Sequence, residues 1–204
     1  MVASTPSYHR IPIICALITA ILIGGSAPFT KLLIEGAGPL ALAALISLGS
    51  GLGALVIYFS RAVTDRHRGR VEAPPDRDDI PWLIGVTVFG GILAPVTLIF
   101  SLPGTPAATA ALLLNFEAVA TTIIAATIFQ EWVSRRVWVA LGCITASCIF
   151  LTLDPAMGFG LSLSALGVLI TCLFWAIDNN LGQRLSAKDP ILIISVKGLG
   201  AGSA

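Results

Sequence analysis

The chain has 204 residues, of which 56% are hydrophobic and only 11% are charged, with a net charge of +1 and a mean hydropathy of +0.92. A soluble domain carries roughly 25% charged residues and could not hide this much apolar surface, so the composition predicts a membrane protein with several spans. The nearly balanced charge gives no signal of nucleic-acid binding.

No histidine lies in the apolar stretches. Both histidines, His9 and His67, lie outside them, which argues against an intramembrane enzyme built on a His-ligated metal or a Ser–His pair. No GxxxxGK[ST] loop is present, so nothing suggests ATP hydrolysis. We therefore expect no enzyme activity, no catalytic residues, no metal and no cofactor. The four cysteines lie in apolar stretches and are interpreted as small hydrophobic residues: Cys15, Cys143, Cys148 and Cys172.

Taken in order, the apolar stretches predict an all-α polytopic membrane protein with six complete transmembrane helices and a partial seventh, since a crossing needs about 20 apolar residues. The predicted spans cover approximately residues 11–33, 40–59, 80–102, 107–129, 137–153 and 164–185, and the partial one begins at 190. That last stretch is too short for a full crossing. It predicts a truncated product, with a deliberately shortened chain as the alternative.

The positive residues predict the orientation. If residues 1–10 are cytoplasmic, the polar loop 60–79 is cytoplasmic too, and this side receives ten of the twelve Lys+Arg. The positive-inside rule therefore predicts a cytoplasmic N-terminus.

The fourth predicted span, 107–129, contains one charge, Glu117, and one amide, Asn115. A carboxylate near the centre of a span costs at least about 2.5 kcal/mol, which makes Glu117 a candidate functional residue. It would pair with a cation or cycle a proton at a cavity wall; the alternative, given equal weight, is a protonated glutamate bonded to a neighbouring helix. Asn115 lies about 200° away around an ideal helix, so we expect it to face another neighbour. A hydrogen bond across the helix interface is favoured over substrate contact.

The sixth predicted span carries a second polar group, the run Asp178, Asn179 and Asn180. Asp178 and Lys197, on the helix running back, lie at nearly equal depths, about 9 and 10 Å from the cytoplasmic end. A buried charge demands a partner, so we predict an Asp178–Lys197 interaction or a shared polar site, with a structural pair slightly favoured. Trp175 shares a face with Asn179 and is a candidate cavity residue, or otherwise core.

The first and sixth spans form a weak internal repeat. They read ALITAILIGGSAPFTKLLIEGAGP and ALGVLITCLFWAIDNNLGQRLSAKDP, and each ends in a cation followed by a short turn closing on proline. Because five spans separate their starts, the two copies run in opposite directions across the membrane. Inverted repeats with a site near the midplane are typical of secondary transporters.

Three stretches resemble the EamA-type transporters of the drug/metabolite transporter superfamily. They are TPAATAALLLNFEAVATTIIAATIFQEWVSRRVWVALG, with Glu131 closing the fourth helix, then GGILAPVTLIFSL, and FWAIDNNLGQRLSAKDP followed by VKGLGAG. The resemblance implies an inverted-repeat bundle of ten helices, with 11–153 as the first five-helix repeat and 164–204 as the truncated start of the second. The chain departs from the pattern in lacking helices eight to ten, and in having Ile23 where the family often has an aromatic residue.

The leading hypothesis is therefore a secondary transporter, by preference an exporter, of a small metabolite or drug-like solute by alternating access. It would lie in the cell membrane (the inner membrane in a bacterium) and be incomplete as this chain. The alternative is a non-transporting remnant or a membrane assembly partner. We expect the lipid bilayer and a small solute as partners, and no nucleic acid. The sequence leaves open the substrate, the direction of transport, the coupling ion and the oligomeric state, including self-association. The candidate substrate- or ion-binding residues are Glu117, Asn115, Asp178, Asn179, Trp175 and Lys197.

Overall fold

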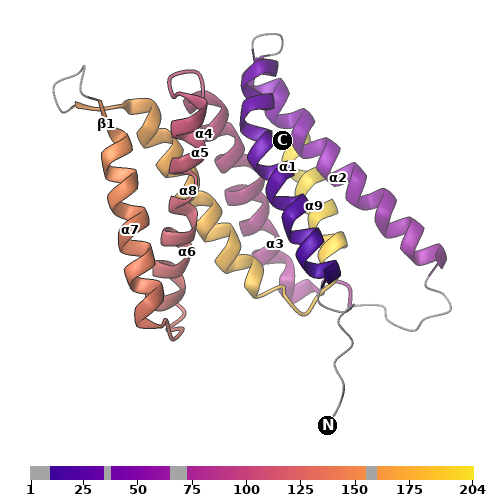
Figure 1. Ribbon diagram of the computed structural model, residues 1–204. Helices are drawn as coiled ribbons and strands as arrows, with labels where there is room; N and C mark the ends of the chain where they lie inside the picture. The colour runs from indigo at the N-terminus through magenta and orange to yellow at the C-terminus, as the bar shows by residue number, and fades with distance from the viewer. Residues whose placement is uncertain (1–9, 35–37, 65–72, 155–159) are drawn as a thin grey trace.

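The computed structural model describes residues 10–34, 38–64, 73–154 and 160–204, and these are almost wholly helical (Figure 1). Most of the predicted N-terminal segment 1–10 lies outside the described residues, and so do three of the five arginines of the predicted loop, Arg66, Arg68 and Arg70. The predicted orientation is therefore not tested and stays a prediction.

The helices follow the predicted spans closely. The first two are α1 (Arg10–Ile34) and α2 (Pro39–Thr64). The third predicted span, preceded by η2 (Arg77–Asp79), consists of three consecutive segments: α3 (Ile80–Val86), the π-helical η3 (Thr87–Leu93) and α4 (Ala94–Ser101). The remaining helices are α5 (Ala107–Leu113), α6 (Phe116–Thr127), α7 (Arg135–Thr152), α8 (Leu163–Gln183) and α9 (Pro190–Ser203). A departure from the all-α prediction is the short antiparallel pair of β1 (Leu153–Asp154) and β2 (Gly160–Leu161) between α7 and α8.

Within the described residues, four helical stretches are long and apolar enough to cross a membrane: Leu40–Arg61, Arg77–Ser101, Ala107–Thr127 and Leu163–Gln183. Helices α1 and α7 cover the first and fifth predicted spans. Large apolar side chains point outward, as on α2 and α7, where Val56 is 68% and Phe150 is 76% exposed. Such a surface suits contact with lipid. The protein is thus an apolar helical bundle of the polytopic membrane type, while the count of six complete crossings stays a prediction.

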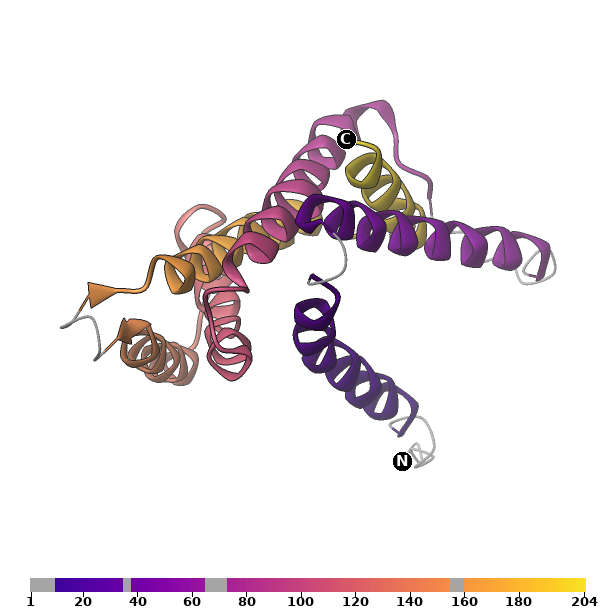
Figure 2. The ribbon, with the colours of Figure 1, turned by 90° about the horizontal axis from the view of Figure 1, so that it is seen from above.

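Helix α8 is the central element of the bundle. It packs against α3, η3 and α4 on one side and against α6 and α5 on the other (Figures 1 and 2). Helix α9 lies along α2 and η3. Helix α1 contacts α5 and α2 and stands apart from the remaining helices when the molecule is viewed from above (Figure 2). A buried apolar cluster joins the ends of α4 and α5 to α7 and α8; it comprises Leu102, Ala110, Leu113, Cys148, Ala165 and Val168.

The contact between α2 and α9 depends on glycine. Gly51 on α2 faces Gly198 on α9, and a Cβ atom at Gly51 would lie 2.8 Å from the carbonyl carbon of Gly198. A Cβ at Gly202, one turn further along α9, would meet Leu48. Small residues spaced in this way let two helix backbones approach directly, a common mode of packing inside membranes.

At one end of the bundle, the segment before α3 contacts the segment between α8 and α9 through polar groups. The Lys188 Nζ, between α8 and α9, lies 2.7 Å from Asp76 Oδ2 and 3.0 Å from Asp79 Oδ2. The Asp189 N–H donates to the Ala73 carbonyl at 3.1 Å. The Asp189 carboxylate also accepts the N–H of Ile191 at 2.8 Å and so caps α9. The segment that leads into α3 is therefore held against the segment that leads into α9.

Gly51→Ala should destabilise the bundle, because its methyl group would overlap backbone atoms of α9. Overpacking of this kind costs about 1–3 kcal/mol. Gly49→Ala is the matched control on the same helix, since a Cβ there meets nothing within 4 Å. Thermal unfolding in detergent would measure both variants. Equal melting temperatures for the two would contradict the close approach of α2 and α9.

The Lys188 contacts predict a dependence on alkaline pH. Hydrogen bonds to Asp76 and then Asp79 raise the pKa of Lys188 above its ordinary 10.5. Folding thus stabilises the charged form, so the contribution is complete below pH 10.5 and is lost as the pH rises through the higher folded-state pKa. Lys188→Met should lower the melting temperature near neutral pH, and its difference from the wild type should shrink in the alkaline range. Arg136→Met, at an exposed cation on α7, serves as control; a deficit that is the same at every pH would refute the ion pairing.

Candidate functional site

The fourth predicted span is interrupted between α5 and α6, at Leu114 and Asn115. The Glu117 N–H donates to the Leu114 carbonyl three residues back, at 3.1 Å, which closes a tighter turn than an α-helix has. The thiol of Cys172, on α8, donates to the carbonyl of Leu113 at this turn, at 3.6 Å. A neighbouring helix therefore helps to satisfy the backbone where the span is broken.

The predicted hydrogen bond of Asn115 to a neighbouring helix is wrong. Its Nδ2 donates to the carbonyls of Leu112, at 3.0 Å, and Ala111, at 3.3 Å, in its own span. The tight turn leaves these carbonyls within reach, and the side-chain amide takes the place of a backbone donor. Asn115 and Glu117 have different partners, one within its own span and the other on α8, although both residues line one hollow.

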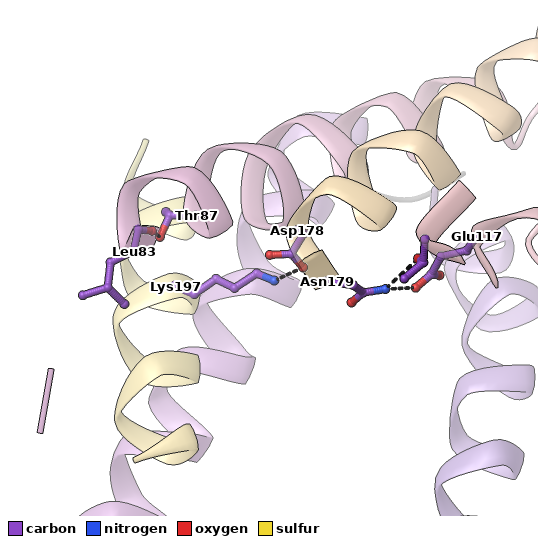
Figure 3. Close-up of polar contacts among 7 residues, drawn as sticks. Leu83, Thr87, Glu117, Asp178, Asn179 and Lys197 are labelled. Carbon is purple, nitrogen blue, oxygen red and sulfur yellow. Dashed lines mark hydrogen bonds and ion pairs between the residues drawn. The ribbon is translucent and has the colours of Figure 1, made fainter. Parts of the chain in front are cut away.

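Glu117 reaches α8. Its Oε1 accepts a hydrogen bond of 2.7 Å from Asn179 Nδ2, which also lies 3.5 Å from Thr121 Oγ1 (Figure 3). The buried Asn180 donates from Nδ2 to the Thr121 carbonyl at 3.2 Å. None of the ion pairs found in the described part of the chain includes Glu117. This carboxyl group therefore has a neutral amide as its partner.

An open hollow of about 470 Å³ lies beside this contact. Five of its seven lining residues have polar side chains: one carboxyl group, two amides and two hydroxyls. The lining residues are Leu114, Asn115, Glu117, Ala118, Thr121, Thr122 and Asn179. The two threonines were not predicted. Thr121 lies four residues after Glu117 and Thr122 seven residues after Asn115, and these helical spacings were the signal that could have identified them. We call this space the Glu117 hollow.

Asp178 contacts Lys197, as the matched depths of the two residues predicted. Lys197 Nζ lies 2.5 Å from Asp178 Oδ2, and the two side chains are only 26% and 11% exposed. A Cβ at Gly90, in the π-helical η3, would overlap the Asp178 carboxylate, so glycine leaves the room that this group occupies. Segments of π-helix are frequent at functional sites. The Gly90–Gly91 pair in the third span was the sequence signal for this close approach.

Adjacent residues of α8 thus point to opposite sides. Asp178 points to Lys197 on α9, whereas Asn179 points to Glu117 on α6 (Figure 3). Trp175 is half-buried one turn earlier on α8 and is not among the residues that line the Glu117 hollow.

A second hollow, of about 340 Å³, lies beside Lys197 between α2, η3, the start of α4 and α9. Lys197 is the one charged residue of its lining, which comprises Ile46, Ser47, Ser50, Gly90, Gly91, Pro95, Ile194, Lys197, Gly198 and Ala201. We call it the Lys197 hollow. One hollow is thus lined by a carboxyl group and the other by an ammonium group.

Nearer the Lys188 connections, Arg184 is held by aromatic rings rather than by a carboxylate. Its guanidinium carbon lies 5.2 Å from the ring centre of Phe129 and 5.7 Å from that of Trp82. One residue before it, Gln183 donates from Nε2 to Glu131 Oε1 at 2.6 Å. These contacts join α8 to the ends of α3 and α6 and frame the site without lining either hollow.

Comparison with known proteins gives concordant results. Residues 10–153 match the model of the EamA-like transporter family. A protein of Methanothermobacter thermautotrophicus, described as an uncharacterized transporter, is 24% identical over 193 residues, which cover 88% of this chain and 55% of that protein. A solved crystal structure matches with a TM-score of 0.61 over 91% of this chain and 62% of its own, at 19% identity, which shows a shared fold. The chain thus spans about half the length of the curated relative that it matches.

The contact between Asp178 and Lys197 can be tested by a double-mutant cycle. Asp178→Asn and Lys197→Gln should each destabilise the protein, by about 3 kcal/mol, because each leaves a largely buried charge without its partner. The double variant removes both charges and should cost less than the sum of the two, by at least about 1 kcal/mol. Unfolding in mixed micelles would measure all four proteins. Strictly additive losses would show that the two charges do not interact.

Proposed function

Because the chain belongs to the EamA-like transporter family, as its sequence motifs predicted, we propose that it acts in secondary transport, exporting a small metabolite or drug-like solute by alternating access. Its family and its apolar spans make it a multi-pass membrane protein of the transporter class. We place the N-terminus in the cytoplasm, since ten of the twelve Lys+Arg then face inward. The bilayer is the cell membrane in this proposal.

The observation that carries the proposal is the interrupted fourth span with Glu117 beside it. In inverted-repeat transporters, discontinuous helices form the substrate and ion sites where the two repeats meet. Here the break between α5 and α6 lies against α8, and Glu117 bonds to Asn179 across this contact. With 11–153 as the first repeat and 164–204 as the start of the second, the contact of Glu117 with Asn179 joins the two repeats. The contact of Asp178 with Lys197 then lies within the second repeat. The Glu117 hollow is thus supported as a binding place.

We assign Glu117 the central part in binding. A charged carboxylate within a span is expensive, and among the described residues Glu117 has an amide rather than a cation as partner. It therefore takes up a proton or the cationic group of a solute, and releases it when the hollow opens to the other side. Asn115 and Asn179 supply amide groups that orient the bound solute, and Trp175 limits the movement of α8 from within the bundle.

Transport into proteoliposomes tests this proposal. The reconstituted chain would be offered a panel of small amines, carboxylates and neutral solutes, with a pH-sensitive dye inside the vesicles. Glu117→Gln should reduce transport at least about tenfold, equivalent to about 1.4 kcal/mol, because glutamine cannot exchange a proton. Asp178→Asn should also impair it.

Asp78→Asn, at an exposed carboxylate outside both hollows, should transport normally and serves as the control. Unimpaired transport by both Glu117→Gln and Asp178→Asn would remove these residues from the site. A wild-type chain that inserts correctly but moves no solute would favour the alternative of a non-transporting membrane protein.

A further inference from the structure

We propose that the Lys197 hollow binds a small solute bearing a carboxylate, and that this carboxylate shares the Lys197 ammonium with Asp178. The proposal rests on the proposed function and adds to it the chemical class of the solute. It concerns a second place in the bundle, on the side of α8 opposite to the Glu117 hollow.

The shape of the Lys197 hollow fits a small solute. Its volume of about 340 Å³ lies at the lower end of the range for ligand pockets, roughly 300–1,000 Å³. Its walls are largely apolar, with glycines and a proline on one side and Ile46 and Ile194 on others. An apolar wall with a few polar groups at one place is the usual composition of a ligand pocket, because the apolar part binds the body of the ligand and the polar part orients it.

The polar groups of the hollow are hydrogen-bond donors. An ammonium group has three N–H donors, and the contact with Asp178 Oδ2 uses one of them. The Lys197 side chain is 26% exposed and borders the hollow, so a ligand can reach the ammonium from that side. The hydroxyls of Ser47 and Ser50, one turn apart on α2, line the same space. A carboxylate has two acceptor oxygens and suits an ammonium with a hydroxyl beside it.

The placement of Asp178 explains why the preference is for an anion. Asp178 is not among the residues that line the hollow, and its carboxylate lies against Gly90, where any larger residue would displace it. An entering ligand therefore meets the ammonium and not the carboxylate. A cationic ligand would be repelled by the ammonium at short range, whereas an anionic one gains a charge-assisted hydrogen bond.

The proposal predicts different effects for the two partners of the ion pair. Lys197→Gln removes the charge that attracts the ligand and should abolish the preference for anions. Asp178→Asn removes the competing negative charge, while its amide oxygen can still accept from Lys197. The ligand then has the full charge of Lys197, so its binding should become tighter. If the ion pair were purely structural, the two variants would not change ligand binding in opposite directions.

The experiment measures binding of benzoate, benzamide and benzylammonium, three compounds of similar size and different charge, to the purified chain in lipid nanodiscs by calorimetry. The wild-type chain should bind benzoate at least about tenfold more tightly than the other two, about 1.4 kcal/mol. Asp178→Asn should tighten benzoate binding by about tenfold again, and Lys197→Gln, which leaves the Asp178 carboxylate without its cation, should no longer prefer benzoate.

Two further variants keep the result interpretable. The double variant Asp178→Asn/Lys197→Gln carries no unpaired charge, so it should fold even where a single variant fails, and it should show no preference for benzoate. Lys188→Gln removes a cation outside the hollow and should bind benzoate as the wild type does. Equal binding of the three compounds by the wild-type chain, or benzoate binding that Asp178→Asn leaves unchanged or weakens, would overturn the proposal.

Failure of this inference can be distinguished from failure of the proposed function by comparing the binding and the transport measurements. Transport of an amine or a neutral solute that depends on Glu117, without any preference for benzoate, would overturn this inference and leave the transporter in place. A selective benzoate site in a chain that transports nothing would support the site and contradict the proposed function.

Discussion

Polar groups inside apolar spans must find their partners within the protein, and this constraint decides how the bundle is assembled around α8. Lipid offers no hydrogen bonds, so an unpaired amide or carboxylate at membrane depth costs several kcal/mol. Three consecutive polar residues of α8 meet this requirement in different ways: Asp178 pairs with Lys197, Asn179 with Glu117, and Asn180 with the Thr121 carbonyl. Among the described residues, no buried side-chain nitrogen or oxygen lacks a hydrogen-bond partner. One turn of α8 thereby fixes its position relative to both α6 and α9.

The same turn also lies between the two hollows, one lined by a carboxyl group and the other by an ammonium group. The Glu117 hollow presents a carboxyl group and the Lys197 hollow presents an ammonium, and the residues that hold these groups, Asn179 and Asp178, are neighbours in the chain. Rotation or translation of α8 would change both contacts together, because a rigid helix cannot move one residue without the next. Because both contacts are made from one turn of α8, any displacement of this helix that breaks one of them would also disturb the other.

The sequence predicted the parts of the structure that depend on hydropathy and depth. The helix positions follow from runs of apolar residues, and the contact of Asp178 with Lys197 follows from equal distances to the ends of two adjacent helices. The interruption at Leu114 and Asn115 was not predictable in this way, since a window of about 20 residues averages over a single turn. The break depends instead on a thiol from α8 and on the Asn115 amide bonding within its own span. The prediction that Asn115 bonds to another helix was wrong for the same reason.

The measurement that most directly tests the account is the water accessibility of the Glu117 hollow, because a site for transport must be reached from water while its neighbours face lipid. In a chain whose cysteines are replaced, with serine at Cys172 to keep a donor, single cysteines would be placed at Thr122, which lines the hollow, and at Ile123, whose side chain points outward and is 40% exposed. A membrane-impermeant thiol reagent reacts with the thiolate, which forms only in contact with water. We expect Thr122→Cys to react rapidly in vesicles and Ile123→Cys not to react; equal reactivity at the two positions, or none at Thr122→Cys, would contradict a water-accessible hollow at Glu117.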